Sequence, residues 1–153
     1  MGWQDRDYAK KATPQRGVWA AGPRPMPQGR SIVTILLIIN VAVFVLCRIS
    51  SQPGRMLTSP LFQWTAMYTP DVLHGQIWRL ITSDYLHWSF GHILMNMIGL
   101  HFLGRPLERD WGPRKFLAIY TIAGLLGSVF YLLLGLCGWL SINGIAAGAS
   151  GCV

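Results

Sequence analysis

Charged residues are scarce in this chain of 153 residues. They make up 12% of the sequence, against about a quarter in soluble proteins, whereas hydrophobic residues make up 52%. Acidic residues are the rarer kind, since six of them stand against thirteen lysines and arginines, and none follows Asp110. This balance argues against an ordinary soluble domain and favours a membrane protein.

Cysteine and metal-binding patterns are scarce as well. The three cysteines, Cys47, Cys137 and Cys152, are in or beside apolar segments and form neither a CxxC motif nor an even-numbered framework. The four histidines include no HExxH motif. We therefore expect no disulfide, no metal site and no cofactor.

Four apolar segments organise the rest of the chain. Residues 1–30 are rich in proline, glycine and charge, so we expect a disordered basic tail ahead of a membrane domain at 31–153. Residues 31–49 span about 28 Å as a helix, which matches the hydrocarbon thickness. Further spanning helices are expected at 87–104 and 116–140, and GIAAGASGCV starts a fourth, in which Gly144 and Gly148 form a GxxxG packing motif. Residues 50–86, with Trp64, Tyr68, Trp78 and Tyr85, are expected to form a loop at the membrane interface.

The basic residues predict the orientation of this all-α helical bundle. They follow no single helix face, so a nucleic-acid groove is not expected. Six precede the first apolar run and four lie in the connection after the second: Arg6, Lys10, Lys11, Arg16, Arg24 and Arg30, then Arg105, Arg109, Arg114 and Lys115. The positive-inside rule puts both groups, and the N-terminus, in the cytoplasm. The starts of helices two and four then lie on the opposite side.

Two residues of the second helix are candidates for chemistry. His92 and Asn96 are four positions apart, so they share a helix face and can donate hydrogen bonds toward one point. Polar residues are expensive in lipid unless they face protein or water. Interhelical packing through hydrogen bonds is the alternative explanation for this pair.

Ser150 is the third candidate. It lies between small residues in GASG, flanked by Gly148 and Gly151, where a substrate backbone could approach and free N–H groups at a helix start could bind an oxyanion. By itself the tetrapeptide is also typical of helix packing.

Taken together, these motifs resemble the rhomboid family of intramembrane serine proteases. The resemblance rests on HWSFGHILMN, on GASG, on Trp78 and Arg79 in the aromatic loop, and on the glycine, glutamate, glycine pattern at Gly104, Glu108 and Gly112. It implies that Ser150 is the nucleophile and that its N–H, His92 and Asn96 form the oxyanion hole. It also implies supporting roles for His87, Trp78, Arg79, Glu108, Gly148 and Gly151.

The family uses a Ser/His dyad, and its general-base histidine lies on a later helix. Neither His74, His87 nor His101 can take this role, and His92 is assigned to the oxyanion hole. His87 lies five positions from His92, about 140° round an ideal helix, and is expected to face elsewhere. We therefore expect that the 153 residues are part of a longer chain, inactive alone, whose base lies beyond Val153.

The resulting hypothesis is a serine endopeptidase in the lipid bilayer that cleaves transmembrane segments of other membrane proteins. The alternative is a catalytically inactive rhomboid-like protein that binds client helices without cutting them. The short basic tail favours a bacterial inner membrane over an organelle membrane.

Overall fold

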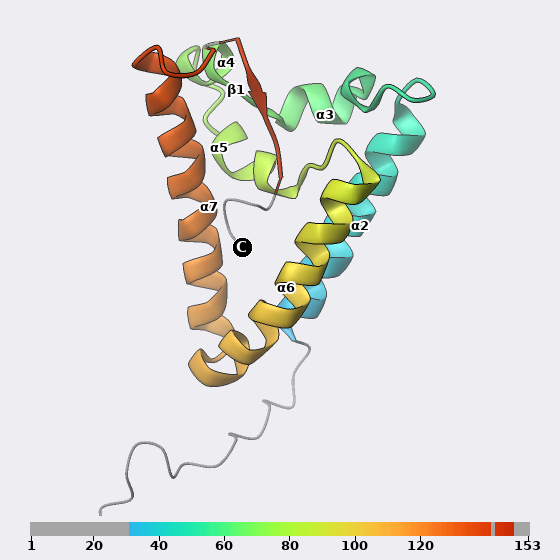
Figure 1. Ribbon diagram of the computed structural model, residues 1–153, viewed down its shortest axis with the longest axis vertical. Helices are drawn as coiled ribbons and strands as arrows, with labels where there is room; N and C mark the ends of the chain where they lie inside the picture. Colours follow the sequence, from blue (N-terminus) through green and yellow to red (C-terminus); the bar gives the residue numbers. More distant parts are fainter. Residues whose placement is uncertain (1–30, 142, 149–153) are drawn as a thin grey trace, which may run out of the picture.

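The computed structural model describes residues 31–141 and 143–148 (Figure 1). The predicted tail, residues 1–30, lies outside this part of the chain. The elements run in the order α2 Ile32–Ser50, η3 Met56–Thr58, α3 Pro60–Thr65, β1 Met67–Tyr68, α4 Thr69–Leu73, α5 Arg79–Thr82, η4 Ser83–Tyr85, α6 Phe90–Trp111, α7 Pro113–Leu136 and β2 Ile145–Ala146, where η marks a 3₁₀-helix.

Two of the described helices, α2 and α7, are long and apolar enough to cross a membrane. Only 22% of the α2 span and 17% of the α7 span is buried inside the protein, so most of their apolar side chains face outward. A core helix of a soluble protein would be mostly buried. The exposed apolar surface of both helices is suited to lipid, as predicted for a helical membrane bundle.

Helix α6 differs from the predicted second helix at both ends. It begins at Phe90 rather than His87, because Ser89 forms the N-cap and its Oγ accepts the His92 N–H at 3.2 Å. It continues through Pro106 to Trp111, so most of the predicted charged turn is helical. Gly112, with φ of +83°, separates α6 from α7, which begins at Pro113 rather than 116 and ends at Leu136 rather than 140.

Glu108 joins the end of α6 to the start of α2. Its carboxylate accepts hydrogen bonds from the Ser31 hydroxyl at 2.5 Å and from the backbone N–H groups of Ile32 at 2.6 Å and Val33 at 3.2 Å. The first N–H groups of a helix have no partner within the helix, and a negative charge there is favourable. The start of α2 and the basic residues around the junction of α6 and α7 therefore lie at the same end of the molecule, as the charge pattern predicted.

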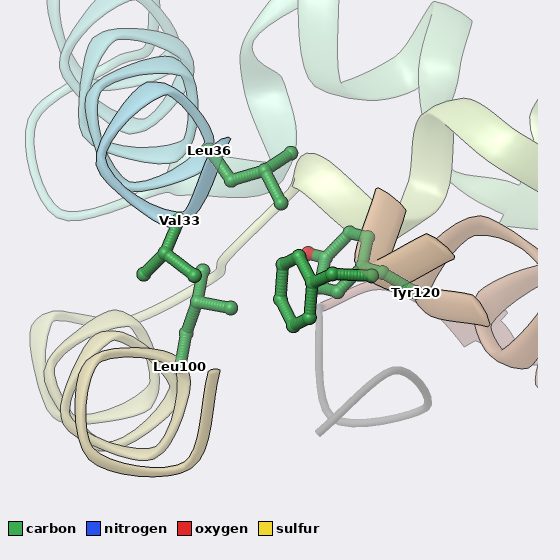
Figure 2. Close-up of a cluster of buried hydrophobic side chains, with 5 residues drawn as sticks. Val33, Leu36, Leu100 and Tyr120 are labelled. Carbon is green, nitrogen blue, oxygen red and sulfur yellow. The ribbon is translucent and has the colours of Figure 1, made fainter. Parts of the chain in front are cut away.

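Helices α2 and α6 pack side by side, and α7 completes the core at this end (Figures 1 and 2). Val33 of α2 and Leu100 of α6 point toward each other, and Tyr120 comes from α7. Gly104 permits the close approach, because a Cβ there would lie 3.0 Å from Val33 Cγ2. Gly104 of α6 thus has a packing role.

The short elements between α2 and α6 lie at the other end, where α7 diverges from the α2 and α6 pair (Figure 1). Strand β1 pairs with β2 in antiparallel register, Met67 opposite Ala146 and Tyr68 opposite Ile145. The prediction that a fourth helix begins within 144–148 is wrong, since Ile145 and Ala146 are extended. Pairing with β1 satisfies backbone groups that a helix would have satisfied internally. Gly144 and Gly148 are therefore not a helical GxxxG pair.

Candidate active site

His92 and Asn96 lie in the first two turns of α6, at the end that carries β1 and β2. Ser89 caps the helix so that His92 is its third residue, and Asn96 follows one turn later. The His92 ring is half-buried, whereas Asn96 is 7% exposed. The amide nitrogen of Asn96 is covered and has no hydrogen-bond partner among the described residues. Such an uncommitted donor is costly unless it serves a ligand or a further contact.

Aromatic rings surround His92. The Trp88 ring centroid lies 4.0 Å from that of His92, and the His87 ring lies 5.0 Å away in an edge-on arrangement. The expectation that His87 faces elsewhere is wrong. Because α6 starts at Phe90, His87 belongs to the preceding connection, and the 140° offset of an ideal helix does not apply. His87 is 1% exposed and braces one side of His92.

The segment before Ser150 lies directly against His92. A Cβ on Gly148 would meet His92 Cε1 and lie 2.6 Å from its Nε2. The Gly148 N–H donates to the Ser83 carbonyl at 2.9 Å, and the β1–β2 pairing holds the two residues of β2 just before it. Ser150 and Gly151 lie outside the described residues. The last described residue, Gly148, is therefore two residues before Ser150 and lies beside His92, the predicted oxyanion donor.

A cavity of about 160 Å³ adjoins this contact. Gly148 lines it together with four polar residues that the sequence analysis did not select: Ser83, Asp84, Ser128 and Tyr131. Asp84 is an acidic residue that is 7% exposed. No signal in the sequence marks Asp84, because only its burial, which is unusual for an acidic residue, distinguishes it.

Trp78 and Arg79 form their contacts with residues of the loop between α2 and α6 rather than with His92. Trp78 stacks on Trp64 at 5.6 Å and donates its ring N–H to the Trp64 carbonyl. The Arg79 side chain donates to the carbonyls of Gln63 and Ala66 at 2.7 Å and pairs with Asp71 at 2.8 Å. Ala66 directly precedes β1, so these bonds hold the strand that pairs with β2.

The remaining predicted residues lie away from this site. Glu108 is sixteen residues after His92 on α6, about 24 Å along the helix, and supports the start of α2. His101 packs against Phe102, and exposed His74 contacts the Pro70 carbonyl at 2.6 Å. Within the part of the chain that the structure describes, no group of three or more His, Cys, Asp or Glu residues is placed to hold a metal ion.

The arrangement can stabilise negative charge. The His92 imidazole and the Asn96 amide are donors one turn apart on one helix, and the segment leading to the candidate nucleophile lies against the first of them. Fixed donors of this kind lower the energy of a tetrahedral oxyanion.

Comparison with known proteins agrees with these features. Residues 74–153 match the profile of the rhomboid domain, from the loop before Trp78 through α6, α7 and the GASG motif. The chain belongs to the rhomboid family. The fold predicted from the motifs, a rhomboid-like bundle of membrane helices, is confirmed.

Several curated rhomboid relatives are similar to parts of this chain. RHOMBOID-like protein 12, mitochondrial, of Arabidopsis thaliana is 38% identical over 68% of this chain and 29% of its own length. Rhomboid protease GluP of Bacillus subtilis is 32% identical over 66% of this chain and 20% of its own length. Inactive RHOMBOID-like protein 8 of Arabidopsis thaliana is 38% identical over 38% of this chain and 16% of its length. The chain thus spans less than a third of each of these relatives.

The close contact between Gly148 and His92 can be tested by mutation in this rhomboid. Its φ of +126° is unfavourable for other residues, and an added Cβ would collide with the His92 ring. With the protease activity proposed below, we expect Gly148→Ala to lower the cleavage rate about 5- to 160-fold, because strain of about 1 to 3 kcal/mol must be relieved by moving the segment or the ring. The measurement is cleavage of a transmembrane reporter by the full-length protein in liposomes.

Gly91→Ala is the matched control. Gly91 is also in the first turn of α6, but a Cβ there would meet nothing within 4 Å, so activity should be unchanged. Equal rates for wild type and Gly148→Ala would show that the close contact with His92 has no role in catalysis.

Proposed function

We propose that the full-length protein is an intramembrane serine endopeptidase that cleaves transmembrane segments of other membrane proteins. Ser150 attacks the scissile carbonyl, and the Ser150 N–H, the His92 ring and the Asn96 amide stabilise the oxyanion that forms. The proposal takes its general base from a histidine outside these 153 residues. Family membership supports a protease-like function, and relatives such as GluP carry that activity in their names.

One observation carries the proposal. Gly148 lies against the His92 ring, although the two residues are 56 positions apart in the sequence. A helical membrane protein with polar residues for packing alone has no need of a backbone conformation that only glycine adopts easily, at φ +126°, beside a histidine. Acyl transfer by serine requires hydrogen-bond donors near the nucleophile, and Gly148, two residues before Ser150, is held against such a donor.

The charge distribution supports a site on the side away from the cytoplasm. The basic residues around the junction of α6 and α7 are at the Glu108 end, and His92 is at the opposite end of α6. We propose that the N-terminus is cytoplasmic and that the membrane is a bacterial inner membrane. Membrane location follows from the family and the apolar helices, but the names of relatives include mitochondrial, chloroplastic and bacterial proteins.

The second candidate is an inactive rhomboid-like protein that binds client helices. The similarity to Inactive RHOMBOID-like protein 8 favours it specifically. Retention of Ser150, His92 and Asn96 argues for the first candidate, since client binding has no physical need for a nucleophile and oxyanion donors at these positions.

A fluorophosphonate probe distinguishes the two. The full-length protein in detergent should be labelled at Ser150, and Ser150→Ala should remove the label completely. Ser141→Ala, which changes an exposed serine in the loop after α7, should be labelled like wild type. Labelling that persists in Ser150→Ala, or a folded wild type that the probe does not label, would favour the inactive protein.

A further inference from the structure

A cavity of about 620 Å³ lies between the loop that follows α2 and strand β2. Its apolar walls include Leu57 and Phe62 from the loop and Ile145 from β2. Leu57 is 51% exposed and Ile145 is 52% exposed, so both present apolar surface that the described residues leave uncovered. An open, mostly apolar cavity with few polar groups is typical of a ligand site.

Trp88 connects this cavity with the candidate active site. It lines the cavity, and its ring centroid lies 4.0 Å from that of His92. Ile145, another lining residue, is three positions before Gly148, whose backbone lies against the same histidine ring. Three residues of extended chain cover about 10 Å. A substrate with its cleaved bond at His92 can therefore place a side chain about three residues away in this cavity.

Arg55 supplies a positive charge at the cavity. Among the described residues that line it, Arg55 is the only charged one. Arg55 is exposed and forms no ion pair with another described residue. Asp71, which lines a smaller neighbouring cavity, is instead paired with Arg79 at 2.8 Å. The charge of Arg55 is thus available for an anionic partner.

The turn that carries Arg55 is held by backbone groups of this residue. The Arg55 N–H donates to the Gln52 carbonyl at 2.9 Å. The Arg55 carbonyl accepts hydrogen bonds from the Thr58 N–H at 3.0 Å and from the Thr58 hydroxyl at 2.8 Å. Replacing the side chain should therefore leave the turn in place.

We propose that Arg55 is a specificity-determining residue that selects substrates with an acidic residue beside the transmembrane segment, on its non-cytoplasmic side. This inference rests on the proposed function, in which the protein cleaves such segments. An apolar side chain of the substrate enters the cavity, and a nearby carboxylate binds the Arg55 guanidinium, whose planar fork matches it. Lysine and arginine are concentrated on the cytoplasmic side of membrane segments, so this charge pattern suits the opposite flank.

Binding of uncleaved reporters tests the inference. The full-length Ser150→Ala variant is placed in phosphatidylcholine nanodiscs, and Kd is measured for fluorescent transmembrane reporters. Each reporter carries one Glu, Gln or Lys about two to five residues from the scissile bond, on its non-cytoplasmic side. We expect Glu to bind about two- to fivefold more tightly than Gln, as for an exposed ion pair, and Lys to bind most weakly. Raising the salt from about 0.1 M to about 1 M should reduce this preference through screening.

Charge reversal at the cavity provides the decisive variants. Arg55→Glu should reverse the order, so that the Lys reporter binds more tightly than the Glu reporter, and Arg55→Gln should remove the difference. Arg48→Glu is the matched control, because Arg48 is also exposed, in the last turn of α2, but does not line the cavity. It should keep the wild-type order. Leu57→Trp, which fills part of the cavity, should weaken the binding of all reporters by a similar factor.

The same measurements can overturn the inference. It is wrong if the three reporters bind equally at every position, if Arg55→Glu keeps the wild-type order, or if Arg48→Glu reverses it as well. Native mass spectrometry in detergent identifies the competing ligand, a lipid phosphate. A loss of bound phosphatidylglycerol in Arg55→Glu, with the order of the reporters unchanged, would assign Arg55 to lipid instead. If Arg55→Glu reduces the folded yield, Arg55→Gln provides the comparison.

The outcomes also separate this inference from the proposed function. Binding to Ser150→Ala needs no catalysis, so it is independent of labelling by the serine probe. Binding that depends on Arg55 and on reporter charge, in a protein that the probe does not label, would retain the selection of acidic clients and reject the protease. Binding that ignores charge, in a protein that the probe labels at Ser150, would reject the role of Arg55 and leave the protease proposal intact.

Discussion

Replacing Arg79 by methionine should lower the free energy of unfolding by about 1.5 to 3 kcal/mol, the usual contribution of hydrogen bonds made by a charged group. The side chain of Arg79 is only 5% exposed and forms an ion pair with Asp71. Its guanidinium also donates to the side chain of Gln76 and to the carbonyls of Gln63 and Ala66. Methionine fills similar space but leaves all of these acceptors without their donor.

The loss should reach the candidate active site through β1. Ala66 directly precedes this strand, and β1 holds the residues that lead to Gly148. Arg79→Lys should also be destabilised, since one ammonium group cannot replace the planar fork of a guanidinium. Activity in both variants should therefore fall together with the fraction of folded protein.

Thermal or denaturant unfolding of the full-length protein in detergent measures this effect. The control is Arg55→Met, which changes an exposed arginine in the same loop and should alter stability by no more than about 0.5 kcal/mol. If Arg79→Met and Arg55→Met have the same stability, the buried hydrogen bonds of Arg79 do not hold the loop.

Asn96→Ala should reduce kcat by about 10²- to 10³-fold, equivalent to about 2.7 to 4 kcal/mol, as when one oxyanion donor is lost. The structure leaves its amide nitrogen buried and without a partner among the described residues, at the end of α6 that Gly148 approaches. A donor that acts only on the oxyanion should change kcat and leave KM nearly constant. Expression and folded yield should stay close to wild type.

Steady-state cleavage of a transmembrane reporter checks this prediction, with Met95→Ala as the control. Met95 precedes Asn96 on α6, is 67% exposed and should be replaceable without effect on kcat. A large loss of folded protein, with normal kcat for the folded remainder, would instead identify Asn96 as a packing residue. The interhelical hydrogen-bond explanation would then hold.

The long helices were predictable because hydropathy over about twenty residues is a property of the local sequence. The predicted spans at 31–49 and 116–140 correspond to α2 and α7, with shifts of one to four residues at their ends. The ends of α6 were less predictable. They depend on single residues, the Ser89 cap and the positive φ of Gly112, and on Glu108, whose partners are on another helix.

The candidate site was likewise predictable from the sequence only in part. The spacing of His92 and Asn96 was enough to place them on one face of a helix, and the structure agrees. The position of His87 beside His92 was not predictable, because a helix was assumed to include it. Asp84 and Asn40 attracted no attention in the sequence, since only burial makes their polar groups unusual.

By itself the sequence determined the membrane class, the three long helices, the shared face of His92 and Asn96, and the resemblance that family membership later confirmed. Only the tertiary structure decided that Ile145 and Ala146 are a strand against Met67 and Tyr68, and that this pairing brings Gly148 to His92. The physical reason is that hydropathy and helical spacing are properties of the local sequence. A strand of two residues exists only because a partner 77 to 79 positions away in the sequence satisfies its backbone groups.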